Sequence, residues 1–240
     1  MLVRKCMSMR RSNPKLSELE NRLAHHKSQS AIPEEIAKKL GVKFTTNQNS
    51  LWFRGASSLD REGGTGLALF GEGLYLTKSP YFAWEYSKKH KDGKVYLFKV
   101  NLNINVVETT SLDFIQAFET ALVLANPLID IGYYAYIDRR KRVKGSFEDL
   151  LRLAYQSQNK EMYVHYLSLL EDEMEKVVSF ELEPDQQDYF YQILRKELES
   201  KGYRGILAYT LRKGLLLFYP EEDAKYLNSV RSSYLKEFYN

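Results

Sequence analysis

Short apolar and aromatic runs mark three strands in the first half of the chain. The runs of strand length are Leu51–Ala56, Gly73–Thr77 and Val95–Asn101. Between the second and third runs, Ser79 is a favourable helix N-cap and Pro80 suits the first turn, which predicts a helix to about Lys89. Asp92-Gly93 is a turn signal that separates this helix from the third strand.

The middle of the chain has the pattern of long helices. Residues 110–129 and 146–178 are expected to be helical, and 189–200 form a further helix that ends at Lys201-Gly202. The apolar stripe of the second segment consists of Leu150, Leu151, Leu153, Leu167, Leu170 and Met174. Two late strands follow at Gly205–Tyr209 and Leu215–Tyr219. Strands before and after a helical middle predict an α+β fold.

The first 45 residues differ in character from the rest. Residues 1–14 form a basic tail, 16–28 are a polar helix candidate, and Ile32–Leu40 is a second helix with Pro and Glu in its first turn. We therefore expect a basic tail and helical extension over 1–45, followed by one folded domain over 46–240.

The composition favours a folded intracellular protein. Hydrophobic residues make up 44% of the 240 residues, enough to bury a core. Cys6 is the only cysteine, so no internal disulfide forms, which suits a reducing cytoplasmic compartment. No apolar stretch approaches the roughly 20 residues of a membrane span, and the basic N-terminus lacks the apolar region of a secretion signal, so we expect neither. The four histidines lack metal-site spacing, and we expect no metal.

The positive charge is concentrated although its total is small. The formal net charge is 35 − 31 = +4. The basic residues gather in three runs: Arg4, Lys5, Arg10, Arg11 and Lys15; Lys88, Lys89, Lys91 and Lys94; and Arg139, Arg140, Lys141, Arg142 and Lys144. Each run is either a solvated surface or a contact for the phosphates of a nucleic acid, and the sequence leaves both interpretations open.

Three residues in the strand runs and one on the next helix are candidates for chemistry. Arg54 interrupts an apolar strand, and a buried guanidinium requires an anionic or polar partner. Gly55 beside it permits close approach of a ligand to the backbone. Tyr75 on the second strand and Tyr86 on the next helix are placed to sandwich a flat ring. The alternatives are a surface arginine and two tyrosines that pack in the core.

Together, these segments resemble the ADP-ribosyltransferase superfamily. The motifs are Trp52-Phe-Arg-Gly55, Phe70-Gly-Glu-Gly-Leu-Tyr-Leu-Thr77, Val95-Tyr-Leu-Phe-Lys-Val-Asn-Leu102 and Gly202-Tyr-Arg-Gly-Ile-Leu-Ala208. The second is most similar to the poly(ADP-ribose) polymerase branch. The resemblance covers about residues 50–105 and 187–226. It implies a split sheet with a helical insertion at about 110–185 and the N-terminal helical extension.

The resemblance also implies roles for particular residues. Arg54 would hold the ribose or phosphates of NAD, Gly55 would meet the nicotinamide carboxamide, and Tyr75 and Tyr86 would stack on the nicotinamide ring. Thr77 and Ser79 would be nearby polar contacts. The implied activity is NAD-dependent mono-ADP-ribosylation of an acceptor protein or nucleic acid, with NAD as substrate.

One departure from the family pattern supports a second hypothesis. The late-strand glutamate of the family is absent, because its matching place is Gly214. Other candidate carboxylates are Glu72, Glu181, Glu183, Glu221 and Glu222. The alternative is therefore a catalytically inactive binding module of this fold that recognises nucleic acid, ADP-ribose or a partner protein.

Overall fold

The computed structural model describes residues 34–41, 50–59, 70–129, 133–138, 141–157, 160–208 and 214–239. The expected basic tail and the helix expected at 16–28 lie outside these residues. So does most of the loop expected after Leu51–Ala56. No helix in the described ranges is both long enough and apolar enough to cross a membrane.

Seven strands form one mixed, open sheet, which confirms the α+β class. Their bounds are β1 (Leu51–Ala56), β2 (Leu74–Thr77), β3 (Lys94–Val100), β4 (Val107–Glu108), β7 (Gly205–Leu207), β8 (Gly214–Leu217) and β9 (Ala224–Arg231). They lie in the order β4-β7-β8-β2-β1-β3-β9. Only β4 and β7 are parallel, while the other neighbours are antiparallel. β1 and β2 share one registered pair, Phe53 with Thr77, whereas β1 and β3 share six.

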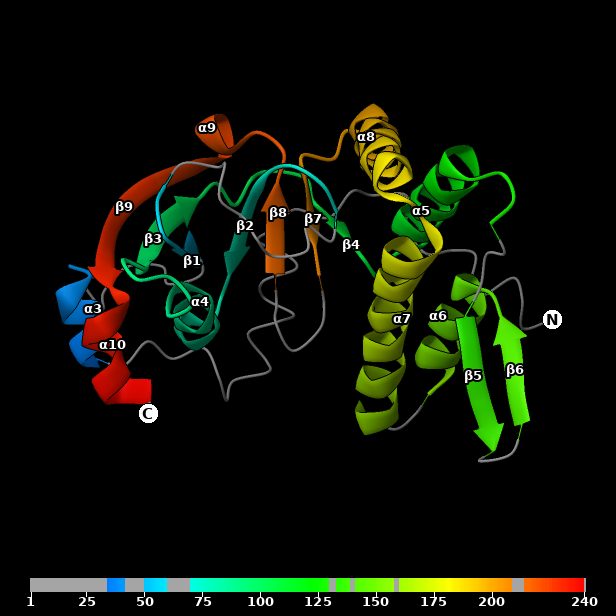
Figure 1. Cartoon of the computed structure of the whole chain (residues 1–240), viewed down its shortest axis with the longest axis horizontal. Coiled ribbons are helices and arrows are strands. Elements are labelled where there is room, and N and C mark those ends of the chain that lie inside the picture. The colour runs from blue at the N-terminus through cyan, green and yellow to red at the C-terminus, as the bar shows by residue number, and fades with distance from the viewer. Residues whose placement is uncertain are drawn as a thin grey trace.

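The helices gather at the two ends of this sheet (Figure 1). Beside the β1–β3–β9 end lie α3 (Glu34–Lys39), α4 (Pro80–Ser87) and α10 (Ser232–Tyr239). The other end carries α5 (Leu112–Ala125), α6 (Phe147–Gln156), α7 (Lys160–Glu181) and α8 (Pro184–Ser200). The short α9 (Pro220–Asp223) precedes β9, and β5 (Tyr133–Asp138) pairs with β6 (Lys141–Gly145) in a separate hairpin.

Side-chain alternation divides the buried residues between the two faces of the sheet. The face opposite the helix-packed clusters carries a cluster that we call the opposite-face core. It includes Trp52, Leu74, Leu76, Tyr96, Phe98, Leu215 and Leu217. The other face carries the helix-bundle core beneath α5–α8 and the edge-helix core beneath α3, α4 and α10. The helix-bundle core is centred on Phe118, whose ring contacts Phe114, Phe147 and Phe190. The buried hydrophobic residues thus form three clusters, one on one face of the sheet and two on the other.

Several expected boundaries are wrong for local reasons. The helix expected over 146–178 is two helices, because α6 ends at the C-cap Ser157 and α7 starts at Lys160. The helix expected to begin at Tyr189 begins at Pro184, where Glu183 and Gln186 form a capping box.

Other elements were not expected at all. The hairpin β5–β6, the edge strand β9 and the final helix α10 had no counterpart in the expected pattern. β9 buries only Val230 among its eight residues, so it lacks the apolar alternation that marks a half-buried strand. Pro220, expected only to end the preceding strand, opens α9.

Candidate functional site

Arg54 and Tyr75 lie on opposite faces of the sheet. Arg54 is paired with Tyr96, and Tyr96 belongs to the opposite-face core. Tyr75 is paired with Leu216, and both pack in the helix-bundle core on the other side. Phe53 and Thr77 are paired across β1 and β2, so their side chains share one face of the sheet. Because side chains alternate along a strand, Tyr75 lies on the face of Thr77 and Arg54 lies on the other. A single ligand on one face of the sheet therefore reaches only one of these two predicted site residues.

Tyr75 has the environment of a core tyrosine. Its hydroxyl accepts a hydrogen bond from the Phe70 backbone N–H at 3.1 Å and donates one to the Gly71 carbonyl at 2.7 Å. Burial raises the pKa of Tyr75 well above its ordinary value. The hydroxyl thus closes the turn before β2 and remains protonated.

Gly55, Thr77 and Ser79 all border α4, with Thr77 and Ser79 at its start and Gly55 beside its middle and end. A Cβ on Gly55 would lie 1.7 Å from the carbonyl oxygen of Ala83, so the helix backbone occupies the space beside this glycine. Ser79 caps α4 by accepting a hydrogen bond from the Phe82 N–H at 3.3 Å, and its own N–H donates to the Thr77 hydroxyl at 3.1 Å. These three residues fasten α4 to the sheet on the face that also carries Tyr75.

Tyr86 stands apart from that group, on the exposed side of α4. Its side chain is 42% exposed, and the Lys89 ammonium lies 5.1 Å from the centre of its ring. The structure therefore brings Thr77 and Ser79 together at the start of α4, while Gly55 lies against the middle and end of the same helix. It leaves Arg54 on the other face of the sheet and Tyr86 near the far end of the helix.

The candidate carboxylates do not gather around the predicted residues. Gly214 begins β8 and is paired with Thr77. Glu222 forms an ion pair with Arg204 at 2.6 Å, beside a second pair from Arg204 to Asp223 at 2.9 Å. Glu183 caps α8 at the other end of the sheet.

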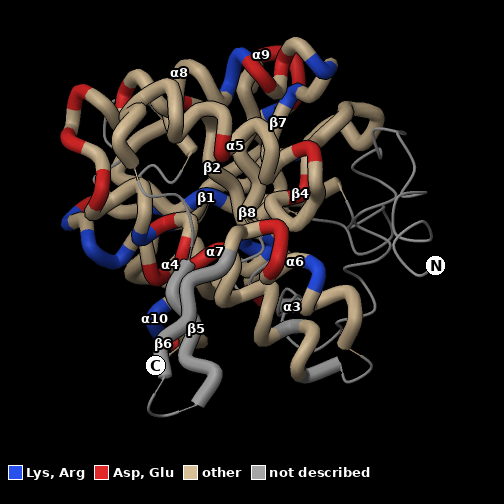
Figure 2. The backbone as a smooth tube through the Cα atoms, turned by 90° about the vertical axis from the view of Figure 1, so that its right-hand side faces the viewer, with Lys and Arg blue, Asp and Glu red and all other residues tan. Residues whose placement is uncertain are grey.

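A strongly cationic hollow of about 870 Å³ lies between the α4–β3 turn and the start of α10. We call it the basic hollow. Its lining residues are Trp84, Lys88, Lys89, His90, Lys91, Asp92, Gly93, Lys94, Arg231, Ser232, Ser233 and Lys236. Six of these carry a positive charge and one carries a negative charge. Figure 2 marks the Lys and Arg positions in blue and the Asp and Glu positions in red, and acidic positions lie on several of the elements outside the hollow.

Backbone contacts hold the walls of the basic hollow together. Lys94 is paired with Arg231 across β3 and β9, and the Ser232 N–H donates to the Gly93 carbonyl at 2.8 Å. The Trp84 indole N–H donates to the Ser232 carbonyl at 3.1 Å. Gly93 is required here, because a Cβ on it would lie 1.8 Å from the Ser87 carbonyl oxygen. The cationic side chains therefore project from a fixed frame.

The charge in the basic hollow is only partly neutralised. Lys88 donates a hydrogen bond to Glu85, an interaction that lowers the pKa of the Glu85 carboxyl, and the same ammonium lies 4.5 Å from the Trp84 ring centre. Setting Lys88 aside, five cationic side chains face one carboxylate, that of Asp92. Such a surface attracts anions of high charge density.

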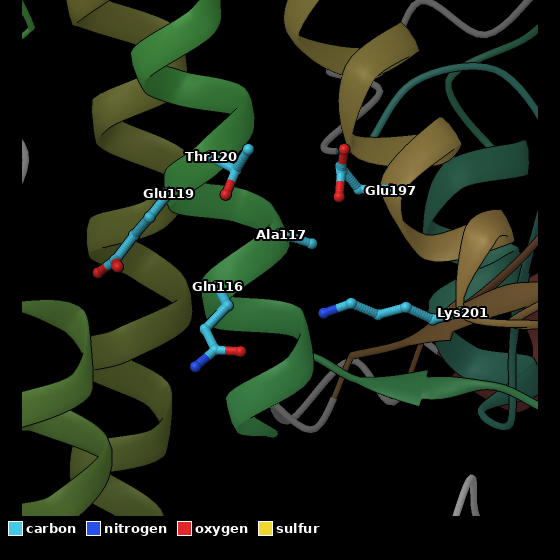
Figure 3. A pocket seen from close by; sticks show the side chains of 6 residues that line it. All are labelled: Gln116, Ala117, Glu119, Thr120, Glu197 and Lys201. Carbon is cyan, nitrogen blue, oxygen red and sulfur yellow. The ribbon is translucent and has the colours of Figure 1, made fainter.

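A second hollow of about 420 Å³ lies between α5 and α8 (Figure 3). Gln116, Glu119 and Thr120 come from α5, whereas Glu197 and Lys201 come from the α8 side. Lys201 extends toward α5, where its ammonium lies 3.7 Å from the Asp113 carboxylate. Desolvation, with a smaller contribution from Glu148, raises the pKa of Glu119. The mixed charges give this hollow no preference for one class of ion.

Comparisons with protein-family models, with curated proteins and with solved structures find no match to this chain. Within the described residues, no group of three or more His, Cys, Asp or Glu side chains is arranged to hold a metal ion.

The sequence indicated four of the six cationic residues of the basic hollow. The lysine run at 88–94 was visible as one of three basic runs, but Arg231 and Lys236 are isolated charges in the sequence. They join the lysines only through the pairing of β3 with β9. Of the other runs, the first lies outside the described residues, and β6 carries Lys141, Arg142 and Lys144.

Proposed function

We propose that this protein binds the phosphate backbone of a nucleic acid in the basic hollow. The observation that carries the proposal is the convergence of six cationic side chains, from the α4–β3 turn, β3, β9 and α10, on one concave surface. Lysine ammonium groups are compact point charges that pair with phosphates along a chain. A concave surface also fits a strand better than the flat surface of a membrane.

The salt dependence of binding tests this proposal quantitatively. Each phosphate neutralised adds about −0.7 to the slope of log K against log salt for a single strand. With five cations available beyond Lys88, the slope should approach about −3.5. Fluorescence anisotropy with a labelled oligonucleotide, titrated at several salt concentrations, measures it. A slope near zero, or no binding at low salt, contradicts the proposal.

Two double variants distinguish the contribution of the basic hollow to binding from that of the net charge of the protein. Lys91→Gln with Lys236→Gln removes two charges from the hollow. Lys99→Gln with Lys225→Gln removes two exposed charges from facing positions of β3 and β9 that do not line it. The first variant should reduce the magnitude of the salt slope by about 1.4, and the second should leave it nearly unchanged. Equal losses in both variants would show that net charge alone governs binding.

NAD-dependent mono-ADP-ribosyl transfer to a protein or nucleic acid is a second proposed function. It is favoured by the adjacency of β1 and β2, the strands that carry the resemblance, with α4 directly after them. On this proposal the sheet is the split sheet of that superfamily, and residues 110–185 are its insertion. Because Arg54 and Tyr75 face opposite ways, NAD bound at Arg54 would not reach Tyr75.

The second proposal is tested by calorimetry with NAD and by release of nicotinamide. Arg54→Ala should abolish NAD binding, whereas Tyr75→Phe should leave it unchanged because that hydroxyl serves the Phe70–Gly71 turn. If the wild-type protein neither binds NAD nor releases nicotinamide with any acceptor, the second function is wrong. Sensitivity to Tyr75→Phe rather than Arg54→Ala would place the ligand on the other face.

A further inference from the structure

We propose that the basic hollow selects single-stranded nucleic acid, with Tyr86 stacking on an unpaired base. This inference rests on the proposed binding of nucleic acid and adds the form of the ligand. It comes from the placement of one exposed aromatic ring relative to the cationic lining.

Tyr86 lies at the rim of the basic hollow. Lys89 lines the hollow and at the same time lies 5.1 Å from the centre of the Tyr86 ring. The ring is 42% exposed, so part of its surface is available to a ligand. A backbone phosphate held at Lys89 would therefore place its own or a neighbouring base within reach of Tyr86.

The other aromatic ring of the site is already enclosed. Trp84 lines the hollow but is only 3% exposed. Its ring packs against Tyr81 and Tyr239, with the Lys88 ammonium 4.5 Å from its centre. Trp84 therefore offers little surface to a base, whereas Tyr86, beside Lys89, retains part of its surface.

Charge alone would favour a duplex over a single strand. Double-stranded DNA has the higher charge density, and its binding depends more steeply on counterion release, by about −0.9 per phosphate against −0.7. In a duplex, however, the base faces are already stacked on one another, and only a single strand can offer one to an exposed tyrosine. A cationic site bordered by an exposed ring should therefore bind a single strand more tightly than a duplex, although charge alone favours the duplex.

The experiment compares a single-stranded oligonucleotide with the duplex of the same sequence, by anisotropy at one salt concentration. The single strand should bind the wild-type protein more tightly. Tyr86→Ala should weaken single-strand binding by about fivefold or more and leave duplex binding unchanged. Tyr86→Phe should retain wild-type affinity, because stacking needs the ring and not the hydroxyl. Tyr189→Ala removes another exposed tyrosine, on α8, and should change neither affinity.

The outcomes separate this inference from the function on which it rests. If neither nucleic acid binds, the proposed function itself fails. If both bind with steep salt dependence but the duplex binds as tightly or more tightly, the proposed function stands and the selection of single strands is overturned. The selection is also overturned if Tyr86→Ala weakens both ligands equally, or if Tyr189→Ala has the same effect as Tyr86→Ala.

Discussion

Replacing Gly55 with alanine should destabilise the fold even when no ligand is present. A Cβ at this position would lie 1.7 Å from the Ala83 carbonyl oxygen and 2.9 Å from the Ser87 nitrogen. Both atoms belong to the backbone of α4, so no side-chain rotation relieves the clash. Since ordinary contacts begin near 3.4 Å, β1 and α4 would have to separate by roughly 3.4 − 1.7 = 1.7 Å.

That separation would loosen the edge-helix core. Ala83 is fully buried there, and Phe53 and Trp84 are nearly so. Overpacking of a core costs about 1–3 kcal/mol, and a clash between two backbones belongs at the upper end. We therefore expect Gly55→Ala to lose about 3 kcal/mol. In a chain of this length such a loss corresponds to a decrease in Tm of about 6–12 °C.

Gly214→Ala is the matched control, because Gly214 is also a strand glycine. A Cβ there would meet its nearest neighbours at 3.9 Å and 4.0 Å, which are ordinary contacts. The unfolding free energy of the Gly214→Ala variant should stay within about 1 kcal/mol of the wild-type value. Urea unfolding, followed by circular dichroism and by the fluorescence of the two tryptophans, measures both variants. If Gly55→Ala unfolds at the wild-type urea concentration and loses only NAD binding, the packing argument is refuted and the nicotinamide contact is supported.

Three further predictions concern packing, a buried hydrogen bond and pH. Phe118→Ala should cost about 3–5 kcal/mol in urea unfolding, because Phe118 is fully buried and its ring contacts that of Phe147 among others. Thr109→Val should cost about 1–3 kcal/mol, since it leaves the buried Glu171 carboxylate without the Thr109 hydroxyl, whereas Thr109→Ser should cost less. Burial raises the pKa of Tyr239 from 10.0 to about 12, so the folded protein holds a proton that the unfolded chain releases, and stability falls as the pH rises between these values. Tyr239→Phe should lose less stability than the wild type over the same pH window.

The strand and helix pattern around the motifs could be predicted because its signals are local. Leu51–Ala56 is the strand predicted from its apolar run, and α4 begins after the Ser79 cap as its sequence indicates. β9 could not be predicted in this way, because an exposed edge strand has no apolar alternation. Its assignment depends on pairing with β3, a contact between distant parts of the chain.

The candidate site was harder to predict than the fold. Arg54 and Tyr75 are chemically suited to a common ligand, but the face that each occupies depends on strand register. Gly55 permits close approach, as its sequence context suggested, yet the group that approaches is the α4 backbone. The same residue type serves either purpose, so the sequence alone does not distinguish a ligand from a neighbouring helix.

The pairing of Lys94 with Arg231 has a consequence for how the protein matures. The two residues are 231 − 94 = 137 positions apart, so one wall of the basic hollow is synthesised long before the other. During translation, the lysine-rich turn leaves the ribosome while β9 and α10 do not yet exist. At the usual rate of about 5–20 residues per second, this interval lasts roughly 7–27 s. The complete arrangement of charges therefore forms only after β9 and α10 have been synthesised, and its appearance reports that the sheet has closed at its β9 edge.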